Sequence, residues 1–461
     1  MRHEYEQFIK RSEDISRDKQ HLQKILKAVN TYDDAVSQRI GQQFVDWQNT
    51  RKKAAEIKDY VLSNLPGLLE TFEKKISANG TKVLWAEDTK EAQRHLLTIM
   101  NEHHVRKVVK MKSMTTEEIY FNEMCEEKGI EVWESDLGEL IVQLAGEKPY
   151  HIVTPAMHKT TAEISQLFHE KLGTPMTDNA EELTMIARNH LREAFVTADL
   201  GVTGANFIIA EDGAIALTEN EGNGRLTVSC PRVHVVIAGI EKVIPNISQL
   251  SLFLPLLATI GTGQEITCYN SIIRGPKKND EQDGPEEMYV ILLDNGRTKL
   301  YKEERFRKIL RCIRCGACLN ACPVYHTIGG HTYNTTYQGP VGSVITPHLR
   351  DMGKWGHLPF ASSLCGSCSD VCPVDIDIHH LLLENRWEIY RKNYISKSFK
   401  TALWIWAFIF SNRRRLNIIS KFRHIGIKVV KPFLSKGIRK RVPSMPVNTF
   451  AQFWRKYEQS G

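Results

Sequence analysis

The chain has 461 residues, which is long for a single hydrophobic core and predicts two or three domains. Hydrophobic residues make up 42% and charged residues 25%, the balance of a globular protein rather than of a disordered or fibrous one. No apolar run reaches the roughly 18 residues of a membrane-spanning helix, and the opening MRHEYEQFIKRSEDISRDKQ lacks the apolar core of an export signal. We therefore expect a cytoplasmic protein.

Residues 1–63 form the first predicted domain, a helical N-terminal arm. Charged and amide side chains alternate there with spaced apolar ones, and Phe44, Trp47 and Ala54 follow a roughly helical period. Two arrangements remain open. The segment is either a solvated arm that wraps a neighbouring protein or a helical hairpin that packs on its own chain.

Residues 64–300 form the second predicted domain, in which strand and helix patterns alternate. Such alternation favours a parallel sheet covered on both faces, and hence an α/β fold. The predicted strands are Lys82–Ala86, Val105–Met111, Ile130–Trp133, Tyr150–Thr154, Asn206–Ala210, Ala214–Thr218, Val233–Ala238, Glu265–Ile273 and Tyr289–Asp294. The predicted helices are Thr89–Glu102, Asn179–Val196 and Ser248–Ile260.

The stretch from residue 201 to 245 has a different texture, rich in Gly and Asn. Glu211-Asp212-Gly213 reads as the turn of a hairpin, and residues 220–225 (NEGNGR) read as a polar loop between strands. Loops of this kind beside a sheet edge can hold an anion or a carboxylate, although plain turn chemistry explains the same composition. The candidate small-molecule site consists of Thr203, Gly204, Asn220, Asn223 and Arg225. No dinucleotide or phosphate-loop motif is present, and no catalytic residue is identifiable.

Residues 301–393 form the third predicted domain and contain seven of the ten cysteines. The first run, from Cys312 to Pro323, spells C-x2-C-x2-C-x3-C-P, and the second, from Cys365 to Pro373, spells C-x2-C-x3-C-P. The first spacing is the signature of bacterial two-cluster ferredoxins, in which the fourth cysteine of a run ligates the other cluster. The pattern therefore predicts two [4Fe-4S] clusters.

The crossover rule assigns the ligands. The first cluster takes Cys312, Cys315, Cys318 and Cys372, and the second takes Cys322, Cys365 and Cys368. A complete second run would place a cysteine where Ser362 stands. The fourth ligand of the second cluster is then Ser362 or a solvent oxygen, or the site holds a [3Fe-4S] cluster; we favour four irons with a weak ligand.

Other uses of these cysteines fit less well. A disulfide framework would suit a small secreted chain, whereas zinc sites need four ligands each and seven cysteines divide badly between two. The remaining cysteines, Cys125, Cys230 and Cys268, stand alone and are expected to be inert thiols.

Residues 394–461 form a basic amphipathic tail. From residue 391 to 461 the chain has 17 Lys or Arg and one acid, Glu458, so this part carries +16 and the first 390 residues carry −9. Such a split predicts a docking segment for an acidic partner or a membrane surface, whereas nucleic acid is not expected because no recognition motif accompanies the charge. Leu403–Phe410 (LWIWAFIF) followed by Arg413-Arg414-Arg415 suits a membrane interface, a partner subunit or the chain's own core.

At these residues a family resemblance emerges. The segments GVTGANFIIAEDGAI and ENEGNGR, the block CIRCGACLNACPVYHTIGGHTYNTTYQGPVGSVITP, and the later LCGSCSDVCPVDI and NTFAQFW resemble the lactate utilization protein B family, iron–sulfur proteins of a bacterial L-lactate oxidation operon. The resemblance covers nearly the whole chain. It implies a lactate utilization domain related to coenzyme A transferase and sugar isomerase folds, followed by an α-helical ferredoxin module.

The resemblance also implies a function. The chain would be an electron-transfer subunit of a complex that oxidises L-lactate to pyruvate. Its expected partners are a subunit with paired-cysteine domains and a second subunit with a lactate utilization domain. A redox-sensing module that binds a metabolite, or a relay for another 2-hydroxy acid, are the alternatives.

Overall fold

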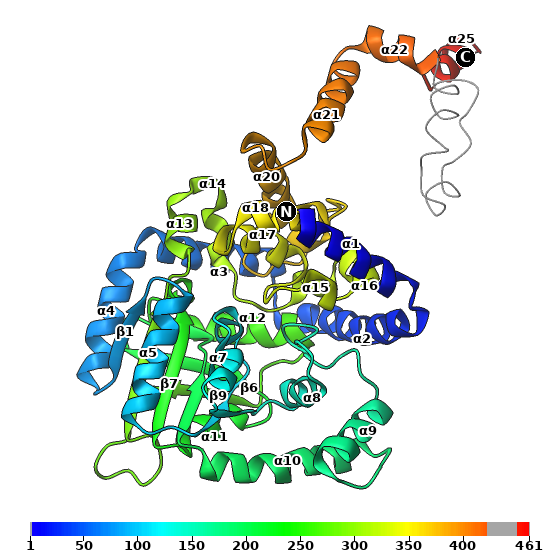
Figure 1. Ribbon diagram of the computed structural model, residues 1–461. Helices are drawn as coiled ribbons and strands as arrows, with labels where there is room; N and C mark the ends of the chain where they lie inside the picture. The colour runs from blue at the N-terminus through cyan, green and yellow to red at the C-terminus, as the bar shows by residue number, and fades with distance from the viewer. Residues whose placement is uncertain (1, 422–449, 461) are drawn as a thin grey trace. The chain divides into compact units, whose positions relative to one another are not determined.

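The computed structural model describes residues 2–421 and 450–460, and the chain divides into two units, Met1–Ile389 and Tyr390–Gly461. The first unit contains the segments that the sequence predicts as N-terminal arm, α/β domain and ferredoxin domain (Figure 1). The second unit contains the basic tail. Each unit is described by itself below.

A six-stranded parallel sheet forms the centre of the α/β segment and confirms the predicted fold class. Its order is β1-β10-β7-β4-β2-β3. The central strand β7 is buried along its whole length, as strands of a two-sided parallel sheet are. The strands are β1 (Lys82–Ala86), β2 (Lys107–Lys110), β3 (Glu131–Glu134), β4 (Leu200–Thr203), β7 (Val233–Gly239) and β10 (Glu287–Leu293).

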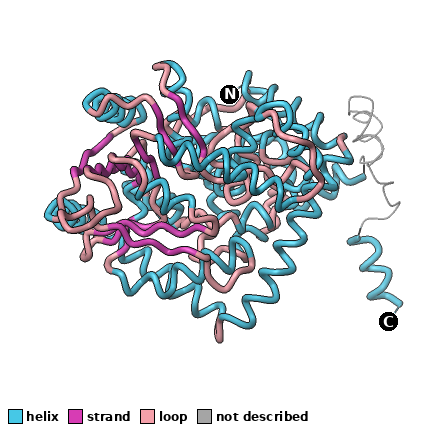
Figure 2. The backbone as a smooth tube through the Cα atoms, turned by 90° about the horizontal axis from the view of Figure 1, so that it is seen from below, coloured by secondary structure: helices cyan, strands magenta, loops and turns pink. Residues whose placement is uncertain are grey.

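The two faces of this sheet have different covers. Val235, Ile237 and Ile291 face α5 (Thr89–Glu102) and α7 (Phe121–Glu127). The alternate residues, such as Val236 and Leu292, pack against α4 (Leu65–Ala78) and a second sheet of order β8-β5-β6-β9. That sheet consists of β5 (Phe207–Ile209), β6 (Ala214–Glu219), β8 (Val243–Ile244) and β9 (Tyr269–Ile273). Figure 2 shows that the strands gather in one half of the first unit and that the other half is helical.

Most predicted elements of this segment are present, and two predictions are wrong. Residues 150–154 form an irregular loop instead of a strand, because the Tyr150 N–H donates to Pro155 O at 2.9 Å within the same loop. The predicted loop at residues 220–225 becomes helical from Asn223, where α11 (Asn223–Ser229) begins. The predicted hairpin is confirmed, because β5 and β6 pair antiparallel and Gly213 supplies a positive φ of 55° in the turn.

The remaining elements of the α/β segment surround the sheets. Leu140, Phe168 and Leu191, from three helices, form a separate core against Val109. The helices are α6 (Met114–Glu118), α8 (Leu137–Ala145), α9 (Thr161–Leu172), α10 (Ala180–Thr197) and α12 (Leu250–Thr262), with 3-10 turns η1 (Ile240–Lys242) and η2 (Ile247–Gln249).

The N-terminal helices pack on their own chain. The helices α1 (Arg2–Arg17), α2 (Lys19–Gln43) and α3 (Trp47–Ser63) match the helical prediction for residues 1–63. Helix α1 lies against α16 and α2 lies along α12, so the packed arrangement holds rather than the solvated arm (Figure 1). Phe8 and Ala54 enter the same core as the cysteine segment.

The cysteine segment is almost entirely helical and shares its core with the α/β segment. Phe207 and Phe253 of the α/β segment pack in one cluster with Cys318, Leu319 and Tyr325. The helices are α13 (Arg297–Lys302), α14 (Glu304–Arg307), α15 (Ala317–Asn320), α16 (Pro323–Ile328), α17 (Gly339–Leu349), α18 (Met352–Trp355), α19 (Ser367–Asp370) and α20 (Ile378–Arg391), with 3-10 turns η3 (Lys308–Arg311), η4 (His331–Tyr333) and η5 (Leu358–Phe360).

The second unit consists, in its described residues, of α21 (Lys397–Phe410), α22 (Arg413–Lys421) and α25 (Phe450–Ser460). No helix among the described residues combines the length and the apolar character needed to cross a bilayer. Part of the predicted basic tail, residues 422–449, lies outside the described residues.

Candidate metal centre

The two cysteine runs fold into loops with the same backbone. In the first loop Arg314 has a φ of +63° and Gly316 a φ of +83°, and α15 follows. In the second loop Leu364 has a φ of +56° and Gly366 a φ of +90°, and α19 follows. The shared left-handed turns identify the runs as two copies of one loop.

The equivalence of the loops also aligns their side chains. Cys365 corresponds to Cys315 and Cys368 to Cys318, so Ser362 stands where the first loop has Cys312. The Ser362 Oγ accepts a hydrogen bond from the Leu364 N–H at 3.1 Å and is therefore turned into its own loop.

Four thiols from both runs influence one another. Burial raises the pKa of Cys315, and the nearby thiols of Cys312 and Cys372 raise it further. Burial followed by Cys312 and Cys315 raises the pKa of Cys318 well above its usual value. Thiols of the two runs therefore lie within electrostatic reach of one another, and Cys318 is also influenced by Cys368 of the second run. The assignment of Cys312, Cys315, Cys318 and Cys372 to one cluster stays a prediction.

The other three thiols form a second group. Burial raises the pKa of Cys368 to about 12, with further contributions from Cys322 and Cys365. Cys365 is exposed, and the Ser367 hydroxyl and N–H lower its pKa. A thiol ligates metal only as a thiolate, so the elevated pKa values of the buried members mark groups that need a metal's positive charge to ionise.

Backbone N–H groups point at several of these sulfurs. Tyr325 N donates to Cys322 Sγ at 3.5 Å, and Ile376 N donates to Cys372 Sγ at 3.4 Å. In both places the residues after the C-P dipeptide turn their N–H groups back to the sulfur. Free thiols in groups of four and three, with N–H donors beside them, fit iron–sulfur clusters and their reduced, more negative states.

A buried basic network lies beside Cys312. Desolvation lowers the pKa of Lys58 and of Lys242 to about 8, and both feel the charge of Cys312. The Arg314 guanidinium lies 4.5 Å from the centre of the Tyr337 ring and donates to Glu241 Oε1 at 3.3 Å. Burial opposes the charge of Glu241, but the neighbouring guanidinium groups hold its pKa at about 2.

Arg297 completes this network and fixes its geometry. It is 0% exposed and donates from Nε to Glu241 Oε2 at 2.5 Å and from Nη1 and Nη2 to Glu118 at 2.8 Å. With Lys58, Lys242 and Arg314 also present, cations outnumber the two carboxylates around Cys312. An anionic cluster there would be electrostatically stabilised.

Helix α3 connects the two runs. Arg51 donates from Nε to Cys372 O at 2.7 Å and from Nη2 to Ser369 O at 2.9 Å, and it pairs with Asp375 at 3.1 Å. Directly before Cys312, Arg311 forms a bidentate pair with Asp59 of the same helix and donates to Asp375 O at 3.1 Å. Helix α3 therefore sets the separation of the runs.

A cavity of about 600 Å³ reaches Cys315 from the α/β side. Of the five residues predicted as a small-molecule site, only Asn220 and Asn223 line it. Thr203 is buried in the sheet, where its hydroxyl pairs with His234 Nε2 at 2.9 Å, and Gly204 packs against Ser113. Arg225 stacks on Tyr269, 5.6 Å from the ring centre.

The cavity beside Cys315 is more acidic than the prediction of an anion site requires. Asp136, Glu219 and Glu221 line it, and burial followed by the charge of Asp136 raises the pKa of Glu221 to about 7. Lys112 is paired with Asp136 at 3.3 Å. Arg314 also lines the cavity, and its Nη1 is buried without a hydrogen-bond partner among the described residues, so the lining carries both signs of charge.

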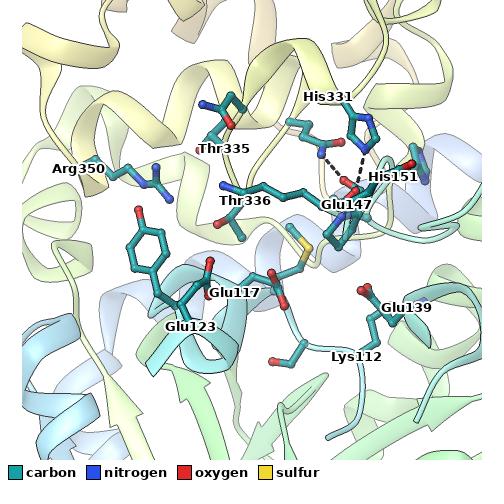
Figure 3. A pocket seen from close by; sticks show the side chains of 18 residues that line it. Lys112, Glu117, Glu123, Glu139, Glu147, His151, His331, Thr335, Thr336 and Arg350 are labelled. Carbon is teal, nitrogen blue, oxygen red and sulfur yellow. Dashed lines mark hydrogen bonds between the residues drawn. The ribbon is translucent and has the colours of Figure 1, made fainter. Parts of the chain in front are cut away.

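A second cavity, of about 290 Å³, lies between the α/β segment and the segment after the first cysteine run (Figure 3). Glu117, Glu123 and Glu139 line one side, and Arg350 and Thr335 line the other (Figure 3). His151 also lines it and abuts the first cysteine loop, because a Cβ at Gly316 would meet its ring at 3.2 Å.

Glu147, His158 and His331 form a group at this cavity whose ligand atoms lie within 4.8 Å of one another. Each already has a partner. His158 Nε2 lies 2.6 Å from Glu147 Oε2, and Lys159 pairs with the other carboxylate oxygen. His331 Nε2 donates to Lys148 O at 2.7 Å (Figure 3). The group thus ties the loop at residues 147–159 to the cysteine segment.

Comparison with known proteins agrees with both halves of the first unit. Residues 69–293 match the LUD domain, and residues 308–376 match the 4Fe-4S dicluster domain. Lactate utilization protein B of Bacillus velezensis is 42% identical over 348 residues, which are 75% of this chain and 73% of that protein. The chain belongs to the lactate utilization protein B family.

Other relatives are of similar closeness. A protein of Escherichia coli K12 named uncharacterized electron transport protein YkgF is 41% identical over 378 residues, 80% of this chain and 79% of that one. Among solved structures, a DUF162 family protein from Deinococcus radiodurans aligns with 50% of this chain and 98% of its own, at 13% identity and a TM-score of 0.28.

For this member of the lactate utilization protein B family, sequence reasoning found the cysteines and missed their surroundings. Arg51 and Lys58 stand seven residues apart on the buried face of α3, with Ala54, Ala55, Val61 and Leu62 between and beyond them. The sequence could have indicated these two residues, because basic side chains on the apolar face of a helix point into the core. Nothing in the sequence marks Glu241 as the partner of Lys58, or Arg297 as the partner of Glu241.

Proposed function

We propose that the protein is the iron–sulfur electron-transfer subunit of a complex that oxidises L-lactate to pyruvate and thereby supports growth on lactate. The observation that carries the proposal is the match of residues 308–376 to the 4Fe-4S dicluster domain, which contains all seven cysteines of the two runs, and thiols of the two runs influence one another's pKa values. The names of the relatives, for lactate utilization and for electron transport, support the same assignment.

In this proposal the cysteines divide as the crossover rule predicts. Cys312, Cys315, Cys318 and Cys372 hold one [4Fe-4S] cluster, and Cys322, Cys365 and Cys368 hold a second centre with Ser362 as weak fourth ligand or with three irons. Bound clusters pass electrons singly, so a two-electron oxidation of lactate requires a relay. Lys58, Lys242 and Arg314 favour the reduced state of the first centre by their charge.

The complex needs further subunits. No flavin or nicotinamide motif is readable in the sequence, so the step that takes the hydrogen from lactate is assigned to a partner. The proposed partners are a subunit with paired-cysteine domains and a second subunit with a lactate utilization domain.

Anaerobic purification with and without these partners tests the proposal. Iron counting should give two clusters per chain, and electron paramagnetic resonance should show lactate reducing them only in the assembled complex. Rapid reduction of the isolated chain by lactate would move catalysis into this subunit. No reduction in either preparation by lactate or by another 2-hydroxy acid would refute the relay.

The cavity next to Cys315 favours a second candidate, a module that binds a metabolite and reports redox state. Its volume of about 600 Å³ is in the range of small-molecule sites. This function predicts saturable binding of a metabolite to the cluster-loaded chain, measured by calorimetry, and no steady-state turnover in the assembled complex. Turnover with lactate would exclude it.

A further inference from the structure

Within the described residues of the second unit, helix α21 presents large apolar side chains that are exposed. None of its 14 residues is buried. Seven of its large apolar side chains are between 37% and 62% exposed: Phe399, Leu403, Trp404, Ile405, Trp406, Phe408 and Phe410. Ring pairs stiffen this surface, with Trp404 5.5 Å from Phe408 and Trp406 4.9 Å from Phe410. An apolar surface of this size marks an interaction site.

The charge around α21 has one sign. Lys397 and Lys400 lie in its first turns, and Arg413, Arg414 and Arg415 follow its end. Residues 391–461 hold 17 basic residues and one acid. Since the first 390 residues carry −9, the cationic surface is local to this segment and attracts an anionic one.

Helix α25 also combines aromatic and basic side chains, and it separates them on opposite faces. Phe450, Phe453, Trp454 and Tyr457 follow the i, i+3, i+4, i+7 spacing of one helix face, and all four are exposed. Arg455 and Lys456 fall on the other side. A short helix with an aromatic face and a basic face is the type that lies in a membrane interface.

We propose that α21, α22 and α25 dock the protein on an anionic lipid surface, with α21 and α25 each seated at the boundary of headgroups and acyl chains. Successive apolar residues at 403–406 point in four directions around α21, so a single protein groove cannot cover them, whereas acyl chains can. At 14 residues α21 is about 21 Å long, short of the ~30 Å hydrocarbon core, so it enters one leaflet without spanning. Arg413–Arg415 then reach back to the lipid phosphates.

Vesicle binding tests the proposal on the full, cluster-loaded chain under anaerobic conditions. Flotation with vesicles of phosphatidylglycerol and phosphatidylcholine should carry the protein upward, and vesicles of phosphatidylcholine alone should not. High salt should release it, because exposed charges are screened. Brominated lipid should quench tryptophan fluorescence, and the quenching should fall in Trp404→Phe/Trp406→Phe.

Matched variants separate local charge from net charge. Arg413→Gln/Arg414→Gln/Arg415→Gln should weaken binding to anionic vesicles by roughly 100-fold at low salt. The control Lys52→Gln/Lys53→Gln/Lys74→Gln removes the same charge from exposed positions of the first unit and should change binding less than about twofold. Trp404→Ser/Phe408→Ser should weaken binding at least about tenfold, and Met185→Ser/Leu226→Ser, at exposed apolar positions of the first unit, should not.

Two results would overturn the proposal. One is the absence of flotation with anionic vesicles. The other is a Trp404→Ser/Phe408→Ser variant that no longer assembles with the partner subunits but binds lipid as before. That result would make α21 a protein-docking helix. Because lipid binding needs neither lactate nor partners, failure of the proposed electron relay would leave these measurements untouched.

Discussion

The two cysteine groups come from one repeated loop and have different environments. In the first group, Cys312 influences the pKa of three cations, Lys58, Lys242 and Arg314. Burial and the other thiols raise the pKa values of Cys315 and Cys318. In the group of Cys322, Cys365 and Cys368 the largest influences are burial, the other thiols, N–H groups and serine hydroxyls, and Cys365 is exposed. A shared backbone therefore fixes which thiols meet, and the packing around it fixes how each centre behaves.

This difference suggests a division of labour along the proposed relay. The four thiols of the first group are buried or partly buried, whereas the second group includes the exposed Cys365 and has one thiol fewer. We expect the second centre to be the one that oxygen and chelators attack first, because solvent reaches it and its fourth position is weakly held.

The largest expected effect concerns the exchange of ligands between the runs. Cys372→Ser should remove the resonance signal of the first cluster, although Cys372 lies in the second run, because its neighbours are Cys312 and Cys315. Cys322→Ser should remove the signal of the second. Iron content and electron paramagnetic resonance of both variants measure this, and loss of the second cluster in Cys372→Ser would contradict the crossover.

Removal of the clamp on α3 should have the next largest effect. Arg51→Met leaves Cys372 O and Ser369 O without their buried donor, so the free energy of unfolding should fall by about 2–4 kcal/mol, and the first cluster should be lost at lower denaturant than the second. Arg94→Met breaks only an exposed pair with Glu91 and should cost less than about 0.5 kcal/mol. Anaerobic urea unfolding measures both variants. If the free energy of unfolding falls equally in the two, Arg51 does not hold the cysteine runs together.

A smaller effect is expected from a substitution that makes the second centre resemble the first. Ser362→Cys restores the position that Cys312 occupies in the first loop, so the second cluster should survive air several-fold longer and any three-iron signal should shrink. Ser363→Cys adds a thiol one residue away, at an exposed position, and serves as the control. Equal lifetimes in the two variants would show that position 362 is not a ligand position.

The fold was largely readable from the sequence because its signals are local. Lys82–Ala86 and Thr89–Glu102 were predicted with the observed bounds, since an apolar run and a capped amphipathic period each lie within one element. The segment at residues 150–154 failed because its backbone is engaged elsewhere. Tyr325 Oη donates to Tyr150 O at 2.7 Å, a contact across 175 residues that no short window contains.

The site divides in the same way. Spacing alone predicts the groups of Cys312 and Cys322, because two-residue gaps and the glycines at 316 and 366 fold one short loop. Arg51, Lys58 and Glu241 reach this site from hundreds of residues or whole domains away, and only packing brings them there. The predicted small-molecule residues do not form one site, because Gly- and Asn-rich sequence at residues 203–225 is also needed to build the sheet and to begin α11.

The smallest expected effect is a faster loss of the second cluster than of the first at low pH. His357 is buried just before Ser362, between Phe8 and Trp355, and burial lowers its pKa to about 4. The unfolded chain binds a proton near pH 6.5 and the folded chain does not, so the free energy of unfolding should fall as the pH drops from 6.5 to about 4. Burial lowers the pKa of His151, His158 and His234 in the same way, so His357→Phe should make this dependence less steep without abolishing it. The variant should also slow loss of the second cluster at pH 5, measured by absorbance. An unchanged slope, or equal protection of both clusters, would show that proton uptake near the second run does not distinguish the two centres.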